Sequence, residues 1–137
     1  MIVPIFLPHL GCQTRCIYCD QDAITDIGSK DLTTRIDRSL DRQKGPFEVG
    51  LYGGNIFGLN PEALEQLFSC FDSHRSKITN FRISTKPIPL DHEIMDILKG
   101  NKVTIIELGI PSFNNHILKL LNRRHSSSDL VNTFNVL

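Results

Sequence analysis

The chain has 137 residues, of which 40% are hydrophobic and 22% are charged, a composition typical of one globular domain with an apolar core. Its 15 Lys and Arg residues balance 15 Asp and Glu residues, which argues against a surface that binds nucleic acid through charge alone. No apolar run approaches the roughly 20 residues of a membrane span, and the short apolar start lacks a basic leader. We therefore expect a cytoplasmic protein without a membrane partner, in which clustered cysteines bind metal or do chemistry.

Strand-like and helix-like segments alternate along the chain. Four stretches predict β-strands at 2–7, 47–52, 79–85 and 103–110, and the last is apolar enough to be covered on both faces. A helix is predicted after each strand. The first has a thin apolar stripe over Leu32–Leu40, and the expected N-caps of the later helices are Asn60, Asp91, Asn114 and either Ser127 or Ser128. Strands separated by helices imply a parallel α/β sheet with right-handed crossovers.

This pattern amounts to about four β/α units in one domain, residues 1–137. The chain ends in a predicted helix, where a fifth strand would normally follow. Half a barrel leaves an inner face and a sheet edge uncovered. We therefore expect either a partner chain that covers the open half barrel or a chain truncated at its C-terminal side.

Three cysteines follow the first predicted strand directly, at Cys12, Cys16 and Cys19. Thiolates with this x3 and x2 spacing can surround one cubane cluster and leave one iron without a protein ligand, to be chelated by a substrate or cofactor. The main alternative is a structural zinc site with His9 as the fourth ligand. Cys70 lies in a predicted helix and is expected to be a buried, inert thiol.

Further candidate residues fall at the carboxyl ends of the other strands, where ligands gather in parallel α/β folds. Gly53 and Gly54 let a ligand approach the backbone, although a plain turn would use them too. Ser84 and Lys86 end the third strand, and Lys86 is either an anion contact or a solvated lysine. Glu107 is either near a ligand or paired with a cation such as Arg82.

The sequence resembles the radical S-adenosylmethionine superfamily, because CxxxCxxC with an aromatic residue before the last cysteine follows a first strand. Within it, the closest resemblance is to the bacterial subgroup similar to the catalytic subunit of Elongator, with oxygen-independent coproporphyrinogen oxidases more distant. The blocks that carry it are Pro4–Cys12, Tyr52–Leu59 (similar to YGGSFTGL), Arg82–Pro87 (RISTRP), Glu107–Phe113 (ELGVQSF) and Leu121–His125 (LNRGH).

The resemblance implies the N-terminal part of a partial (β/α)6 barrel that binds a [4Fe–4S] cluster and S-adenosylmethionine. Such a site cleaves S-adenosylmethionine reductively to a 5′-deoxyadenosyl radical, which takes a hydrogen atom from a substrate. The implied partners are an electron donor such as flavodoxin or ferredoxin and an unidentified substrate, with transfer RNA suggested by the Elongator-like group alone. The implied cluster ligands are Cys12, Cys16 and Cys19, and the implied cofactor contacts are Tyr18 (adenine), Gly53, Gly54 and Asn55 (amino group), Ser84 (ribose) and Arg123 (carboxylate).

Two departures from the family pattern affect the site. Asn55-Ile56-Phe57 replaces Ser-Phe-Thr, so that only backbone contacts are expected to survive there. Pro111 replaces a glutamine that contacts the cofactor in relatives, and proline offers neither a side-chain hydrogen bond nor a backbone N–H. The alternative function is therefore a truncated, non-catalytic module that binds an iron–sulfur cluster or zinc.

Overall fold

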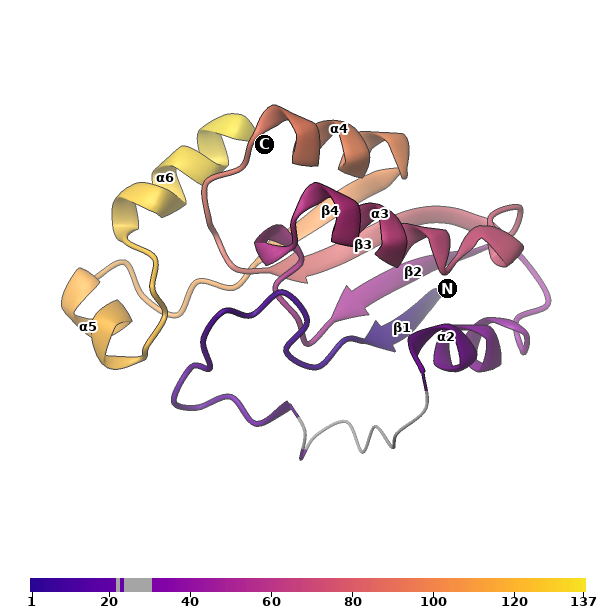
Figure 1. Ribbon diagram of the computed structural model, residues 1–137, viewed down its shortest axis with the longest axis horizontal. Helices are drawn as coiled ribbons and strands as arrows, with labels where there is room; N and C mark the ends of the chain where they lie inside the picture. The colour runs from indigo at the N-terminus through magenta and orange to yellow at the C-terminus, as the bar shows by residue number, and fades with distance from the viewer. Residues whose placement is uncertain (22, 24–30) are drawn as a thin grey trace.

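The computed structural model describes residues 1–21, 23 and 31–137, and Figure 1 shows the arrangement of their helices and strands. Four parallel strands form one sheet in the order β1-β2-β3-β4, as the alternating sequence pattern predicts. The elements, in chain order, are β1 (Ile2–Phe6), α2 (Leu32–Leu40), β2 (Phe47–Tyr52), η1 (Ile56–Gly58), α3 (Pro61–Ser69), η2 (Asp72–His74), β3 (Ile78–Thr85), α4 (His92–Gly100), β4 (Val103–Leu108), α5 (Asn115–Leu120) and α6 (Ser127–Val136).

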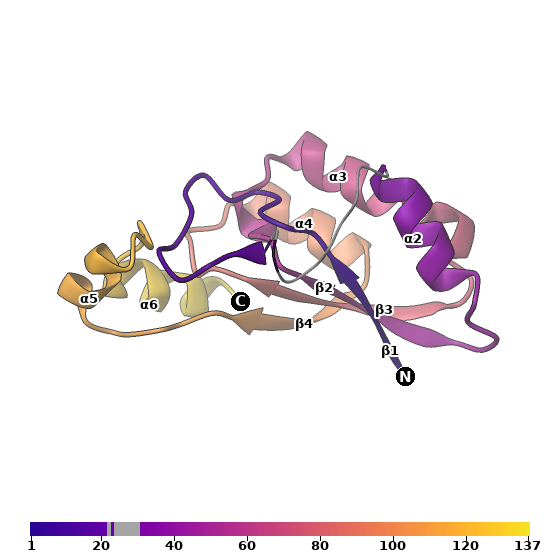
Figure 2. The ribbon, with the colours of Figure 1, turned by 90° about the horizontal axis from the view of Figure 1, so that it is seen from below.

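Helices α2, α3 and α4 cover one face of the sheet, whereas α5 and α6 lie toward the carboxyl ends of the strands (Figure 2). Strand β3 shows why the layers form, because its side chains alternate between the two faces. Phe81 and Ile83 enter the core beneath the helices, and Arg82 lies on the other face, partly exposed. Phe81 packs edge-to-face against both Phe68 and Phe71. Strand β4 ends at Leu108, two residues before the end that the sequence predicts.

The predicted helix starts are confirmed at three positions. The side chains of Asn60, Asp91 and Asn114 each accept a hydrogen bond from a backbone N–H of the first helical turn, and Pro61 occupies the first turn of α3. The expected cap of α6 at Ser127 or Ser128 is wrong. Ser126 caps this helix because only Ser126 has Asp129 three residues later, which allows the reciprocal bonds of a capping box.

The prediction that the fourth strand is covered on both faces is also wrong. Residues of β4 are at best half-buried, and Thr104 is exposed. The physical reason is position, because β4 is the last strand in the order and pairs with β3 alone among the described strands. Its apolar residues Ile106 and Leu108 nevertheless pack against the core. Nowhere in residues 1–21, 23 and 31–137 is there a helix with the length and apolar character needed to cross a membrane.

Candidate functional site

A pocket of about 430 Å³ opens at the carboxyl ends of the strands. It brings together the loop after β1, the loop after β2, the end of β3 and the segment after β4. Its lining contains eight of the nine residues that the sequence singles out for cluster or cofactor, namely Cys12, Cys16, Tyr18, Cys19, Gly53, Gly54, Ser84 and Arg123. The ninth, Asn55, does not line it.

The cysteine loop holds its shape through backbone hydrogen bonds. The Cys12 N–H donates to the His9 carbonyl at 2.9 Å, and the Cys19 N–H donates to the Cys16 carbonyl at 3.1 Å. Gly11 adopts a left-handed conformation with φ of 73°, and a Cβ there would collide with the Asn55 carbonyl. Glycine is therefore required where the cysteine loop crosses the loop after β2.

The three thiols of the cysteine loop line the same pocket. Cys16 is buried, and Cys12 and Cys19 are half-buried. In the described part of the chain, no three His, Cys, Asp or Glu side chains form a group that could hold a single ion. The thiolates that surround a cubane lie farther apart than the ligands of one ion, because each binds a different iron. Three thiols lining one pocket are the donor set that a cluster requires, and the choice between a cluster and a zinc site with His9 stays a prediction.

Arg123 reaches the cysteine loop from the turn between α5 and α6, and only 8% of its surface is exposed. Its Nη1 donates to the Cys16 Sγ at 3.5 Å and to the Tyr18 hydroxyl at 3.2 Å, and its Nη2 donates to the Gly109 carbonyl. Its Nε is buried and has no hydrogen-bond partner among the described residues. A buried guanidinium donor without a partner is costly, and an anionic ligand in the pocket would remove that cost.

Nearby positive charges affect the pKa values of Cys12 and Cys16 to different extents. Burial raises the pKa of Cys12, and the nearby Lys86 opposes that rise only in part. Burial also acts to raise the pKa of Cys16, but the hydrogen bond from Arg123 and the charges of Lys86 and Arg123 outweigh it and lower the pKa below its ordinary value. The thiolate, the form that binds metal, is therefore favoured at Cys16.

The glycine pair after β2 brings backbone close to the cysteine loop. Gly53 has a φ of 85°, and its carbonyl accepts from the His9 N–H at 3.0 Å. A Cβ on Gly54 would lie 2.8 Å from the Leu10 carbonyl oxygen and 2.9 Å from that of Leu7. The sequence leaves open whether this glycine pair makes a plain turn or lets a ligand approach the backbone. The structure shows a tight turn that also lines the pocket, so the two interpretations are compatible.

Asn55 is buried and connects three loops instead of facing the pocket. Its Oδ1 accepts from the Thr85 hydroxyl at 2.9 Å and from the Lys86 N–H at 3.1 Å, and its Nδ2 donates to the Gly11 carbonyl at 3.4 Å. Its backbone N–H and carbonyl bond to Leu10 and Gly58. The amide thus supports the pocket walls, a role that an isolated sequence cannot reveal because its partners come from distant segments. The predicted cofactor contact of the Asn55 backbone stays a prediction.

Other pocket residues were either left open by the sequence or given no role by it. The Lys86 Nζ donates to the Thr14 carbonyl at 3.3 Å, so this lysine holds the cysteine loop as well as lining the pocket. Pro111 lines the pocket too. Thr85 and Gly109 line it as well, within segments that the sequence places at the carboxyl ends of the strands without assigning these two residues a role. Cys70, expected to be buried, is only half-buried, because it lies at the end of α3, away from the pocket. Its thiol donates to the Gln66 carbonyl at 3.4 Å.

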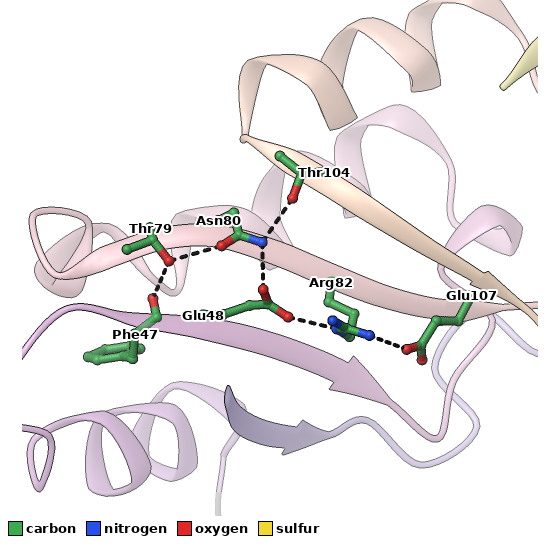
Figure 3. A network of polar contacts seen from close by, with 7 residues as sticks. All are labelled: Phe47, Glu48, Thr79, Asn80, Arg82, Thr104 and Glu107. Carbon is green, nitrogen blue, oxygen red and sulfur yellow. Dashed lines mark hydrogen bonds and ion pairs between the residues drawn. The ribbon is translucent and has the colours of Figure 1, made fainter. Parts of the chain in front are cut away.

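Glu107 forms an ion pair with Arg82. Of the two possibilities that the sequence leaves open for Glu107, contact with a ligand or pairing with a cation, the structure shows the second. The Arg82 Nη1 lies 2.7 Å from the Glu107 Oε1, and the Arg82 Nε lies 2.6 Å from the Glu48 Oε1. Figure 3 shows this network across β2, β3 and β4, with Asn80 bridging Glu48 and Thr104. Hydrogen bonds from Arg82 lower the pKa of Glu48, and the two carboxylates raise the pKa of Arg82. The network stabilises the face of the sheet that α2, α3 and α4 leave uncovered.

Comparison with known proteins identifies the family. The model of the Radical SAM superfamily matches residues 6–137. The chain belongs to the radical SAM superfamily. The heme chaperone HemW of Lactococcus lactis subsp. lactis is 27% identical over 123 residues, and an uncharacterized protein of Methanocaldococcus jannaschii is 27% identical over 135 residues. These matches cover 84% and 93% of this chain.

A solved structure supports the same radical SAM fold. The archaeal Methanocaldococcus infernus Elp3, with an N-terminal deletion, superposes over 96% of this chain with a TM-score of 0.61 and 16% sequence identity. The Elongator-like and coproporphyrinogen oxidase-like resemblance in the sequence is therefore confirmed. The chain covers only 32% and 39% of the two sequence relatives and 33% of the Elp3 chain. It thus corresponds to part of a radical SAM domain.

Proposed function

We propose that Cys12, Cys16 and Cys19 hold a [4Fe–4S] cluster, and that this chain binds S-adenosylmethionine beside it. The observation that carries the proposal is the shared pocket. Three thiols of one short loop line it together with Gly53, Gly54 and, from a turn 107 residues further along the chain than Cys16, the buried Arg123. A plain surface loop would need neither a pocket formed by such distant segments nor thiols beside a buried cation. These features together support a site for a cluster and its cofactor.

When bound and reduced, the cluster would supply the electron that cleaves S-adenosylmethionine to a 5′-deoxyadenosyl radical, which abstracts hydrogen from the substrate. The residues of this chain bind and orient. Arg123 would bind the carboxylate of the cofactor through the donor that now lacks a partner. The glycine turn at Gly53 and Gly54 would admit the amino group to the backbone. Tyr18 and Ser84 would contact the adenine and the ribose.

The positive charge around the pocket would favour both the cluster with its thiolate ligands and the carboxylate of the cofactor. Lys86 and Arg123 both lie near Cys12 and Cys16; burial still raises the pKa of Cys12, with the two charges opposing that rise in part, whereas hydrogen bonding and charge from Arg123 and Lys86 outweigh burial and lower the pKa of Cys16. A cluster with three thiolates carries net negative charge, so these two cations would also favour its retention. An electron donor such as flavodoxin or ferredoxin would supply the reducing equivalent, and the substrate is left open.

The experiment is anaerobic reconstitution with iron and sulfide, followed by incubation with S-adenosylmethionine and dithionite. We expect 5′-deoxyadenosine and methionine to form only when cluster, cofactor and reductant are all present. Arg123→Lys serves as the matched variant, since it keeps the charge but loses the planar fork that reaches Cys16, Tyr18 and Gly109. It should retain iron and lose at least tenfold in affinity for S-adenosylmethionine. A chain that holds the cluster yet never yields 5′-deoxyadenosine would contradict the enzymatic part.

One observation favours a second candidate, a cluster-binding module without catalysis. Pro111 lines the pocket where the family glutamine would contact the cofactor, and it supplies neither an amide side chain nor an N–H. Loss of one such hydrogen bond costs about 1–3 kcal/mol of binding. Pro111→Gln separates the candidates, because a gain in S-adenosylmethionine binding without any cleavage would point to the non-catalytic module.

A further inference from the structure

The turn between α5 and α6 directs consecutive side chains into two different pockets. Arg123 enters the pocket of the cysteine loop, whereas Arg124 and His125 line a second pocket of about 320 Å³. The remaining lining of this second pocket comes from Asn115 and Lys119 on α5, from Asn122, and from Ser126 at the start of α6. The proposed cluster and cofactor have no contact assigned to this side of the turn.

The backbone of the turn is unusual in a way that creates this division. Asn122 has a φ of 55° and Arg124 a φ of 56°, so two non-glycine residues adopt the left-handed conformation within three positions. Asparagine tolerates that region, but arginine is uncommon there, and such conformations cluster at functional sites. The Asn122 amide fixes the turn by donating to the Arg15 carbonyl at 2.8 Å. The strained turn thereby sets Arg124 on the opposite side from Arg123.

His125 provides an independent sign that the second pocket takes a ligand. It is only 6% exposed, and neither buried ring nitrogen makes a hydrogen bond of normal geometry with the described residues, although the Arg123 backbone lies close enough to favour the protonated ring. Burial lowers the pKa of its imidazole, with the positive charge of Arg123 acting in the same direction. A neutral imidazole has one N–H to donate, and a buried donor without an acceptor is destabilising. A ligand that brings acceptor oxygens into this pocket would satisfy it.

The charged groups around the second pocket favour an anionic ligand. Lys119 and Arg124 are exposed cations on its rim, and the amides of Asn115 and Asn122 are further polar groups in its lining. The carboxylate nearest in the turn is that of Asp129, and it accepts from the N–H and the hydroxyl of Ser126 in the capping box. The acidic group is thereby turned to the helix start, and Arg and Lys remain to bind anionic oxygens.

We infer that this second pocket binds a phosphate group of a ligand other than S-adenosylmethionine. The planar guanidinium of Arg124 matches two phosphate oxygens, the ammonium of Lys119 adds a point charge, and the imidazole of His125 adds a donor from the buried side. The site needs neither iron nor cofactor, so its failure and the failure of the proposed radical function are separate results.

The test uses the metal-free chain and inorganic phosphate as the probe. Phosphate is titrated into ¹⁵N-labelled protein at constant ionic strength, and we expect saturable shifts at the amides of 115–126 while those of the cysteine loop stay in place. Lys119→Gln with Arg124→Gln should weaken binding at least tenfold. Lys99→Gln on α4, which removes an exposed lysine elsewhere, is the matched control and should bind as the unchanged chain does.

A second titration identifies the source of the phosphate. Adenosine monophosphate and a short ribonucleotide are compared with inorganic phosphate on the same amides. Tighter binding of the monoester indicates a small phosphorylated ligand, and tighter binding of the oligonucleotide indicates a phosphodiester backbone. His125→Phe, which keeps a ring of similar volume, should reduce affinity in either case. Linear shifts without saturation, shifts centred on the cysteine loop, or equal loss in the Lys99 variant would each overturn the inference.

Discussion

The helix-covered core and the pocket at the carboxyl ends of the strands are held together by different forces. Large apolar side chains that are almost completely buried form the core, among them Phe68, Phe71 and Phe81. The pocket depends instead on loops joined by a few directional contacts, above all those of Asn55 and Arg123. Core stability and site integrity should therefore respond to different substitutions.

Removing one cysteine should give the largest effect on the site with little effect on the stability of the core. Cys16→Ala should abolish retention of iron after anaerobic reconstitution, because two thiolates cannot hold the cluster that three hold. The free energy of unfolding of the metal-free chain should change far less than in a core variant, since the thiol lies at the pocket. Iron and sulfide analysis measures the first effect, and urea unfolding measures the second. Cys70→Ala is the control, and equal iron loss from both variants would refute the ligand assignment.

Phe81→Ala should have the reverse effect, lowering the stability of the core while leaving the site intact. Phe81 is completely buried, with ring centroids 5.2 Å from Phe68 and 5.1 Å from Phe71. Truncation of a buried phenylalanine costs about 3–5 kcal/mol, which urea unfolding would show as a lower midpoint. Phe113→Ala, at an exposed position, should cost little. If the Phe81 variant still folds at low temperature, it should keep its cluster; a folded variant without iron would break the separation.

Asn55→Ala lies at the boundary between the two regions and should affect both. Removing the amide leaves the Thr85 hydroxyl and the Lys86 N–H without their acceptor. We expect a loss of about 1–3 kcal/mol in the free energy of unfolding, together with weaker S-adenosylmethionine binding. Asn132→Ala, on the exposed side of α6, provides the matched control. Unchanged cofactor affinity in the Asn55 variant would show that the pocket does not depend on this amide.

The smallest expected effect concerns the network on the uncovered face of the sheet. Hydrogen bonds from Arg82 lower the pKa of Glu48 below its ordinary value of 4.5. The depressed pKa means that the folded state binds fewer protons, so this stabilisation is present above pH 4.5 and is lost as the pH falls through the folded-state pKa. Glu48→Gln should flatten the acid side of the stability curve measured by urea unfolding between pH 6 and pH 3, roughly the range over which carboxylates titrate. An unchanged slope would show that the ion pair contributes nothing measurable.

Much of the fold follows from local pattern. The alternation of Phe81 and Ile83 with Arg82 and Ser84 predicts both the strand and the face that it buries, and capping residues such as Asn60 locate helix starts. The half-exposed state of β4 was not predicted, because it depends on which strands flank β4 and not on its own residues. The cap of α6 was misplaced by one or two residues among three consecutive serines, although the Ser126–Asp129 spacing carried the signal.

The candidate site divides in the same way. The cysteines and the glycine pair are visible as local motifs, and Arg123 was found through family resemblance. The three-way role of Asn55 and the divided turn at Arg123 and Arg124 were not predictable, because each depends on contacts between segments far apart in the sequence. The alternatives at Glu107 required the structure as well, since only the sheet register brings Arg82 within 2.7 Å of it.

The most direct test of the central claim is electron paramagnetic resonance of the reconstituted, dithionite-reduced chain with and without S-adenosylmethionine. We expect about four irons per chain and a reduced-cluster signal, as a [4Fe–4S] centre gives, and a change in that signal when the cofactor is added because it chelates the iron without a protein ligand. A colourless protein that binds one zinc ion through its cysteines, or a cluster signal that ignores S-adenosylmethionine at saturating concentration, would contradict the account.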